Sequence, residues 1–505
     1  KAGHYLQKAG EQSAARYANE EAIHYFTKAL EITPQSNHEQ RFDLLMLRED
    51  LNSICGNREG QIKDLELASK LILAMDDGVK RLNFVLKKAG YFEQTGKYQE
   101  ALDLLEEAKL NATSQHDLPQ KASIHKAIGF IYWKKGSFTE ALKESEIALE
   151  MARQAGLTKL EAGVLHDLAV IQWRMGSVDK AREMAEQSLI ISRSLSDTRG
   201  ESLAYSILGN IELSKHHHQE AREYYQKMLQ SETKIGDVRG QGMAQGNLGI
   251  IAEIECDHST AIEIFKNVRD IFQRMDDLAS EARAWAHIGL DYSLQGLFVK
   301  ASLNLEKAMI IFRKIDGKQG LQWVLGLLSR VSFDNGQITQ SEKYCLEALE
   351  IAQNAGIKYY EKFSWWMLGR VHLAQGKIDK AESDFQKAKN DASEEKKNNS
   401  VQASLAEIEL MRGNFENALS FVNEILVEGT DLPFETDNKD RLEILLLCYK
   451  VLAANNDGRA KVVLDSAHKL LFEQVEHIDD LSIRQALLEN VPANREILAA
   501  YRQQG

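Results

Sequence analysis

The sequence predicts an all-α protein, folded as a right-handed α-solenoid of helical hairpins. Three observations support this prediction: proline is rare, good helix formers dominate, and a short motif recurs at a constant spacing along the chain. Only 4 prolines occur in 505 residues. Because proline breaks helices, a chain that nearly lacks it favours an all-helical fold. Alanine, leucine, glutamate, lysine, glutamine and arginine, which dominate the composition, all have high helix propensity.

The recurring motif marks an internal repeat, and GKYQEA and GSFTEA are clear copies of it. Its last residue recurs at one 40-residue spacing over eight copies, and a ninth copy follows after a slightly shorter step. These nine markers are Ala101, Ala141, Ala181, Ala221, Ala261, Ala301, Ser341, Ala381 and Ala418. Weaker copies end at Ala22, Gln61 and Ala460, which gives up to twelve units. A period of this length indicates stacked supersecondary units that share one continuous core.

A second position of the repeat is small in every clear unit, which indicates where two helices cross. Twelve positions before the markers stand Ala89, Gly129, Ala169, Gly209, Gly249, Gly289, Ser329, Gly369 and Ala406. Small residues on facing turns let two helices approach closely. Glycines such as Gly96 and Gly136 stand where the first helix must stop, because glycine tolerates the left-handed conformation that ends a helix. Each unit is therefore predicted to be helix A, a tight turn, helix B and a second turn.

This pattern resembles the tetratricopeptide repeat, and IGFIYWKKGSFTEALKESEIALEMA (128–152) is a good example. The usual unit of that family is shorter, at about 34 residues. The 40-residue spacing therefore implies longer helices, as in members found in signalling scaffolds and bacterial regulators. The resemblance covers nearly the whole chain, and it is specific for fold rather than for function.

Two segments resemble a narrower family, the C-terminal sensor regions of multidomain signal-transduction ATPases. They are 41–75 and 482–498, and 4–32 is similar to the first helices of the same array. The resemblance implies a nucleotide-binding domain upstream in the same polypeptide. That domain would lie outside these residues, because they contain no G-x-x-x-x-G-K-[ST] motif. The absence of a starting methionine agrees with the expectation that the sequence is a piece of a longer protein.

The chain is divided into three predicted regions, which differ in how closely they follow the 40-residue pattern. Residues 1–80 are expected to form N-terminal helices and degenerate repeats, and residues 81–390 to form the regular 40-residue array. Residues 391–505 are expected to form shorter or degenerate repeats and capping helices.

Composition argues against several classes of function. The net charge of −13 and the lack of a basic stripe argue against direct nucleic-acid binding. No apolar run is long enough for a membrane span. The four cysteines are scattered without a CxxC pair, which predicts no metal site and suits a reducing cytoplasm. Catalytic and phosphate-binding motifs are missing, so we expect no enzyme activity and no cofactor in this chain.

The resemblance implies that helix A of each unit lines the concave groove of the solenoid. When the marker is counted as position 20, the inward positions are 2, 5, 6, 9, 12 and 13. Trp285 and Trp365 fall at position 4, which packs between helices. The other four tryptophans fall at inward positions and predict two groups of groove residues.

The first predicted group consists of Phe130, Trp133 and Trp173, beside Lys134 and Arg174. The second predicted group combines aromatic side chains with an arginine pair, and its members are Trp323, Arg330, Phe333, Phe363, Trp366 and Arg370. Aromatic residues with arginine are typical of binding hot spots. Two arginines at one frame position could hold a carboxylate or a phosphate. The alternative is that they pair with acidic neighbours such as Glu361 or Asp334.

Two weaker signals complete the candidates. Asn247 falls at position 6, where related peptide-binding repeats hold a peptide backbone. His216, His217 and His218 replace the usual glycine turn, and a solvated turn is favoured over a metal site because three adjacent histidines rarely converge on one ion.

These observations predict a cytoplasmic sensor or regulatory solenoid of a signalling protein, which recognises a protein or peptide in its groove. Two alternatives stay open. The chain could be a stand-alone scaffold that assembles partners, or a non-catalytic part of an enzyme whose active domain lies elsewhere.

Overall fold

The computed structural model describes residues 2–112, 118–275, 277–315, 317–355, 358–389, 399–426, 438–476 and 478–504. These residues form 26 α-helices and no β-strand. The chain divides into two compact units, each of which is described by itself. Unit 1 is Lys1–Ile251 with Asp270–Asp277, and unit 2 is Ala252–Arg269 with Leu278–Gly505.

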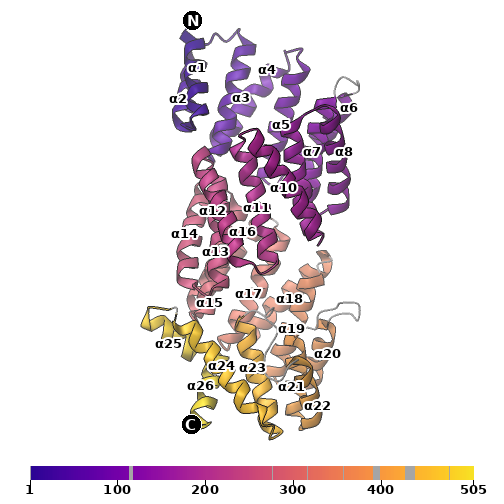
Figure 1. Cartoon of the computed structure of the whole chain (residues 1–505), viewed down its shortest axis with the longest axis vertical. Helices are drawn as coiled ribbons and strands as arrows, with labels where there is room; N and C mark the ends of the chain where they lie inside the picture. The colour runs from indigo at the N-terminus through magenta and orange to yellow at the C-terminus, as the bar shows by residue number, and fades with distance from the viewer. Residues whose placement is uncertain are drawn as a thin grey trace. The chain divides into compact units, whose positions relative to one another are not determined.

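Unit 1 is built from consecutive hairpins whose two helices lie side by side (Figure 1). Its helices are α1 (Ala2–Ala15), α2 (Asn19–Ile32), α3 (His38–Ile54), α4 (Arg58–Ile72), α5 (Gly78–Gln94), α6 (Tyr98–Asn111), α7 (Leu118–Lys135), α8 (Phe138–Gln154), α9 (Thr158–Arg174), α10 (Val178–Ser194), α11 (Thr198–Ser214) and α12 (His218–Ile235). The residues of α13 (Val238–Ile254) and α14 (His258–Arg274) are divided between the units.

Unit 2 continues with the same kind of hairpin and closes with two further helices (Figure 1). Its helices are α15 (Leu278–Leu294), α16 (Phe298–Lys314), α17 (Lys318–Asp334), α18 (Ile338–Ala355), α19 (Lys358–Ala374), α20 (Ile378–Ala388), α21 (Asn399–Met411), α22 (Phe415–Ile425), α23 (Asn438–Ala454), α24 (Arg459–Glu476), α25 (Leu481–Asn490) and α26 (Pro492–Gln504). The weaker copies of the motif also begin second helices of hairpins, since α2, α4 and α24 start beside Ala22, Gln61 and Ala460.

The turn between helices A and B has the same backbone conformation in every regular repeat. Each of these turns has a residue with positive φ at the same frame position, and it is glycine at most of them: Gly96, Gly136, Gly176, Gly296, Gly336 and Gly376. His216 and Cys256 occupy the same place with φ of 61° each. The histidine run therefore forms a helix-ending turn, in which a residue with a Cβ atom adopts a conformation that favours glycine.

Relieving this strain is expected to stabilise the protein. His216→Gly and Cys256→Gly should each raise the free energy of unfolding by about 1 kcal/mol, because the left-handed conformation costs a residue with a Cβ atom roughly that amount. Chemical denaturation of the two variants and the parent measures the change. Destabilisation by both variants would mean that their side-chain contacts outweigh the backbone strain.

The small residues of helix A lie where the second helix of the hairpin approaches most closely. A Cβ added at Gly209 would lie 2.5 Å from a ring carbon of Tyr225, and one added at Gly369 would lie 2.4 Å from a ring carbon of Phe385. Tyr225 and Phe385 are fully buried. An aromatic ring of helix B therefore fills the space that the glycine leaves on helix A, as ridge-into-groove packing requires.

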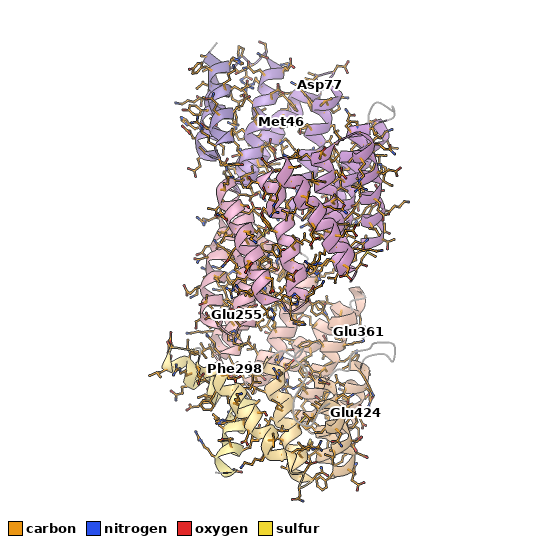
Figure 2. All side chains as sticks on the ribbon, viewed as in Figure 1. Met46, Asp77, Glu255, Phe298, Glu361 and Glu424 are labelled. Carbon is orange, nitrogen blue, oxygen red and sulfur yellow. The ribbon has the colours of Figure 1, made fainter. Side chains whose placement is uncertain are left out.

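Each unit has its own series of apolar clusters between neighbouring helices. Figure 2 labels one buried member of a cluster in each unit, Met46 and Phe298. Met46 is buried among α2, α3 and α4 in unit 1, and Phe298 is buried in a cluster of α15, α16 and α17 in unit 2. In that cluster α25 and the residue that follows it also contribute, through Leu487 and Val491. The C-terminal segment thus caps the apolar face of the preceding repeats.

The prediction of an all-α solenoid of helical hairpins is confirmed. No helix in the described part of the chain is both long and apolar enough to cross a membrane. The three predicted regions, 1–80, 81–390 and 391–505, stay a prediction.

Candidate recognition site

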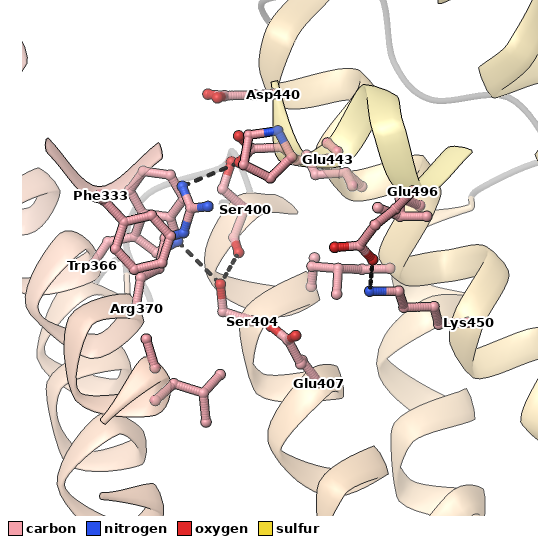
Figure 3. Close-up of a pocket in the computed structure, with 18 of the residues that line it drawn as sticks. Phe333, Trp366, Arg370, Ser400, Ser404, Glu407, Asp440, Glu443, Lys450 and Glu496 are labelled. Atoms are coloured by element: carbon pink, nitrogen blue, oxygen red, sulfur yellow. Dashed lines mark hydrogen bonds and ion pairs between the residues drawn. The ribbon is translucent and has the colours of Figure 1, made fainter. Parts of the chain in front are cut away.

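A cavity of about 330 Å³ opens within unit 2, among helices α17, α19, α21, α23 and α26 (Figure 3). A cavity of this volume can take one or two side chains of a peptide, since small-molecule sites begin at about 300 Å³. Its wall is lined by Phe333, Asp334, Trp366, Arg370, Leu373, Ala374, Ser400, Ala403, Ser404, Glu407, Met411, Asp440, Glu443, Ile444, Leu446, Leu447, Lys450, Pro492, Ala493 and Glu496.

The first helices of three successive repeats supply one side of the cavity at the frame positions expected to face inward. Position 9 contributes Arg370 and Glu407, and position 13 contributes Asp334, Ala374 and Met411. Because residues four apart share a face of a helix, positions 5, 9 and 13 form a single stripe that faces the cavity. The opposite side comes from α23 and α26.

The arginine pair holds a carboxylate, and that carboxylate belongs to the chain itself. Arg330 Nη2 lies 3.2 Å from one oxygen of Glu443, and Arg370 Nη1 lies 3.1 Å from the other. Arg330 Nη2 also lies 2.6 Å from Asp440 Oδ1. Burial alone would lower the pKa of Arg330, but Asp440 and Glu443 outweigh burial and raise that pKa. The alternative that the arginines pair with acidic residues is therefore realised by Asp440 and Glu443 of α23, and the charge of Asp334 also raises the pKa of Arg330.

Aromatic rings enclose the arginines. The Arg370 guanidinium lies 4.6 Å from the centre of the Phe333 ring and 5.0 Å from that of Trp366. Trp366 is only 7% exposed, and its indole Nε1 donates to Ser404 Oγ at 3.1 Å. The open groove position expected for Trp366 is not found, because α21 packs over the ring. Phe363 lies beside it, with ring centres 5.7 Å apart.

The far side of the cavity holds a second ion pair. Lys450 Nζ of α23 lies 2.6 Å from Glu496 Oε2 of α26. Figure 3 shows this pair across the cavity from Trp366 and Arg370, with Glu407 between them. Glu407 is half-buried, and burial raises the pKa of its carboxyl. The site therefore combines an apolar and aromatic lining with several charges in close proximity.

Trp323 lies apart from the arginine pair. Its ring stands edge-on to His287, with centres 5.1 Å apart, and His287 stacks on Phe265 at 4.4 Å. His287 Nδ1 lies 2.9 Å from Glu253 Oε1. Although burial opposes it, Glu253 raises the pKa of His287. Trp323 of α17 thus packs toward His287 of α15, which in turn stacks on Phe265 of α14. The second predicted group is therefore divided between this aromatic cluster and the cavity that holds the arginine pair.

The first predicted group forms two separate clusters in unit 1. Phe130 and Trp133 lie 5.2 Å apart by ring centres, and Lys134 Nζ lies over both rings. Trp173 is covered by Arg174 at 4.6 Å. All three aromatic residues are half-buried. Because each cation already covers its own ring, these pairs offer less aromatic surface than the sequence suggested.

The remaining candidates lie elsewhere. Asn247 is half-buried on α13. Trp285 and Trp365 pack against the apolar clusters of unit 2, as position 4 predicted. His217 Nδ1 lies 2.8 Å from Glu212 Oε2. Among the described residues, no group of histidine, cysteine and acidic side chains has the arrangement of a metal site.

Glu407, Asp440 and Glu443 were not among the residues predicted from the sequence. The repeat frame could have found Glu407, because it stands at position 9, directly after Arg330 and Arg370 in the series. Asp440 and Glu443 lie beyond the last clear marker, where the spacing of the repeat changes, so no frame position was available for them.

Comparison with known proteins identifies the repeats. The tetratricopeptide repeat family matches residues 160–231 and 321–394, and a second profile of the same description matches residues 366–433. No curated protein sequence is similar enough to count as a match.

Three solved structures illustrate similar folds. A Signal Transduction ATPase with Numerous Domains protein with a tetratricopeptide repeat sensor, from Pyrococcus horikoshii, is 16% identical with a TM-score of 0.48, over 77% of this chain and 56% of that one. A Rap protein complexed with Competence and Sporulation Factor is 13% identical with a TM-score of 0.46, over 68% and 100%. The apo quorum sensor NprR from B. thuringiensis is 13% identical with a TM-score of 0.49, over 69% and 98%.

The chain spans a little over half the length of the Pyrococcus horikoshii protein. The matched residues 160–231 and 321–433 include several of the 40-residue markers. The predicted resemblance is confirmed where the family models match: residues 160–231 and 321–433 are similar to tetratricopeptide repeats.

Proposed function

We propose that the chain is a regulatory solenoid that binds an extended segment of a protein or peptide in the cavity of unit 2. The observation that carries the proposal is the cavity itself, which gathers Phe333, Trp366 and Arg370 with apolar side chains of three other helices. Aromatic and arginine residues dominate binding hot spots. An apolar cavity with a few fixed polar groups is the usual form of a ligand site.

The arrangement supports binding rather than a reaction. The charged groups of the cavity are mainly held in ion pairs, and its wall, as far as the structure describes it, includes no histidine or cysteine. The Ser404 hydroxyl is engaged by the Trp366 indole and by the carbonyl of Ser400. A role in signalling in the cytoplasm, with a nucleotide-binding domain in the same protein, is part of the proposal. It rests on the resemblance of 41–75 and 482–498 to sensor regions.

Blocking the cavity without breaking a contact is expected to abolish binding. Ala374 is exposed and lines the cavity at the end of α19, so Ala374→Trp adds a ring to the opening. Peptides selected on the parent chain from a random library should bind this variant at least about tenfold more weakly, since occupying a ligand's space removes its contacts. Calorimetric titration measures the affinities.

The matched control is Ala454→Trp. Ala454 is also exposed and is also the last residue of a helix, α23, but it does not line the cavity. Its variant should bind like the parent. Equal binding by Ala374→Trp and the parent would place recognition elsewhere and would refute the proposal.

A further inference from the structure

The cavity of unit 2 is lined by five carboxylates and two cations, an excess of negative charge. Asp440 and Glu443 are held by the arginine pair, and Glu496 is held by Lys450. Asp334 also has an interaction partner. Glu407 differs from these four, because it forms no hydrogen bond or ion pair within the part of the chain that the structure describes. Among the described residues, one carboxyl in the cavity is therefore left without a hydrogen bond or an ion pair.

The environment of Glu407 makes this lack of a partner costly. The side chain is half-buried, so its ionised form is partly removed from water. Arg370 and Lys450 act on it only at longer range, and each is bound to another acid. An ionised group that is partly removed from water needs a partner of opposite charge. A cation that entered the cavity could therefore form an ion pair with the Glu407 carboxylate.

The surroundings of Glu407 define what else the ligand must carry. Ala403, Met411 and Ile444 are apolar and line the same cavity, and Phe333 and Trp366 stand at its edge (Figure 3). A flexible aliphatic chain with a terminal cation suits this combination, because its methylene groups cover apolar surface while its charge reaches the acid. Lysine and arginine side chains have this form.

We infer that the cavity recognises a basic side chain, lysine or arginine, of the bound peptide, and that Glu407 is the residue that receives its charge. The inference rests on the proposed function and adds the ligand class. An acidic ligand is disfavoured, because Glu443 and Asp440 already neutralise the arginine pair and an incoming carboxylate would meet a surplus of like charge.

The test uses acetylated and amidated hexapeptide pools, which carry no terminal charge. One position is fixed as lysine, arginine, norleucine or glutamate, and the others are uncharged mixtures. Each pool is titrated against the full chain, Glu407→Gln and Glu409→Gln. Glu409 lies on the same helix as Glu407, but it is bound to Arg412, Asn414 and Asn417 and does not line the cavity.

The lysine and arginine pools should bind the parent about tenfold or more tightly than the norleucine pool, since a buried charge pair is worth at least that factor. Glu407→Gln should remove this preference, and Glu409→Gln should keep it. Equal binding of norleucine and lysine pools, a preference for glutamate, or a lysine preference that survives Glu407→Gln would overturn the inference and leave the proposed function standing. Failure of every pool to bind the parent would instead overturn the proposed function, and the inference with it.

A second measurement checks Glu407 without any ligand. If its carboxylate has no partner in the free protein, Glu407→Gln should raise the Tm at pH 8, because the neutral amide needs no counter-charge. Glu409→Gln should lower it or leave it unchanged, since that carboxylate has partners. A lower Tm for Glu407→Gln would show that the carboxylate is already satisfied and would overturn the inference.

Discussion

Arg330→Met is expected to lower the free energy of unfolding by about 3 kcal/mol, because removal of one member of a buried charge cluster leaves uncompensated charge. Arg330 is the partner of both Asp440 and Glu443, and its side chain is 13% exposed. Without it, the two acids of α23 lose the cation that they share, while Glu443 keeps its ion pair with Arg370. Urea denaturation followed by circular dichroism measures the loss.

A double-mutant cycle separates the charge effect from lost packing. Glu443→Leu in the Arg330→Met background should cost less than Glu443→Leu alone, because the acid has then already lost its ion pair with Arg330. The coupling should be on the order of 1 to 3 kcal/mol, as is usual for residues in direct contact. Strictly additive effects would mean that the arginine pair and Glu443 do not act together.

The second large effect is a dependence of stability on pH that comes from Glu232 in unit 1. This carboxyl is 3% exposed on α12, and it accepts a hydrogen bond from Ser202 Oγ. Burial is the main cause that raises its pKa from 4.5 to about 7, and Asp237 adds to the rise. The folded protein thus holds the proton more tightly than the unfolded chain, so stability falls as the pH rises between 4.5 and 7.

Glu232→Gln should remove this dependence. The free energy of unfolding of the variant, relative to the parent, should rise by about 3 kcal/mol from pH 4.5 to pH 8, which corresponds to the size of the pKa shift. Denaturation curves at a series of pH values measure the difference. Glu223→Gln, an exposed glutamate of the same helix, is the control. A constant difference between parent and Glu232→Gln at all pH values would contradict the assigned pKa.

The fold could be predicted because the same sequence pattern recurs in each hairpin of the array. The 40-residue spacing placed the turns correctly even where glycine is replaced, at His216 and Cys256. The small residue twelve positions before the marker also predicted the close approach of helices, as at Gly209 against Tyr225. Each of these features is local to one hairpin, so a single sequence contains the information needed to find it.

The candidate site could be predicted only in part, because it joins regular and irregular parts of the chain. The frame placed Arg330 and Arg370 one repeat apart, where they could hold a carboxylate or a phosphate of a ligand or pair with acidic neighbours, and in the structure they pair with an acid of the chain itself. It could not show that the carboxylate is Glu443, since α23 packs against the array by tertiary contacts that no periodicity records. The same packing buries Trp366 through α21, whereas Trp323 faces His287.

The most direct test of recognition in the cavity is photo-crosslinking from position 374. A benzophenone amino acid placed at Ala374 should form an adduct with a selected peptide, and mass spectrometry should find the peptide joined at that residue. The same amino acid at Ala454, outside the cavity, should give none. An adduct at position 374 alone is the result we expect. Adducts at position 454, or at neither position although the peptide binds, would contradict recognition in the cavity of unit 2.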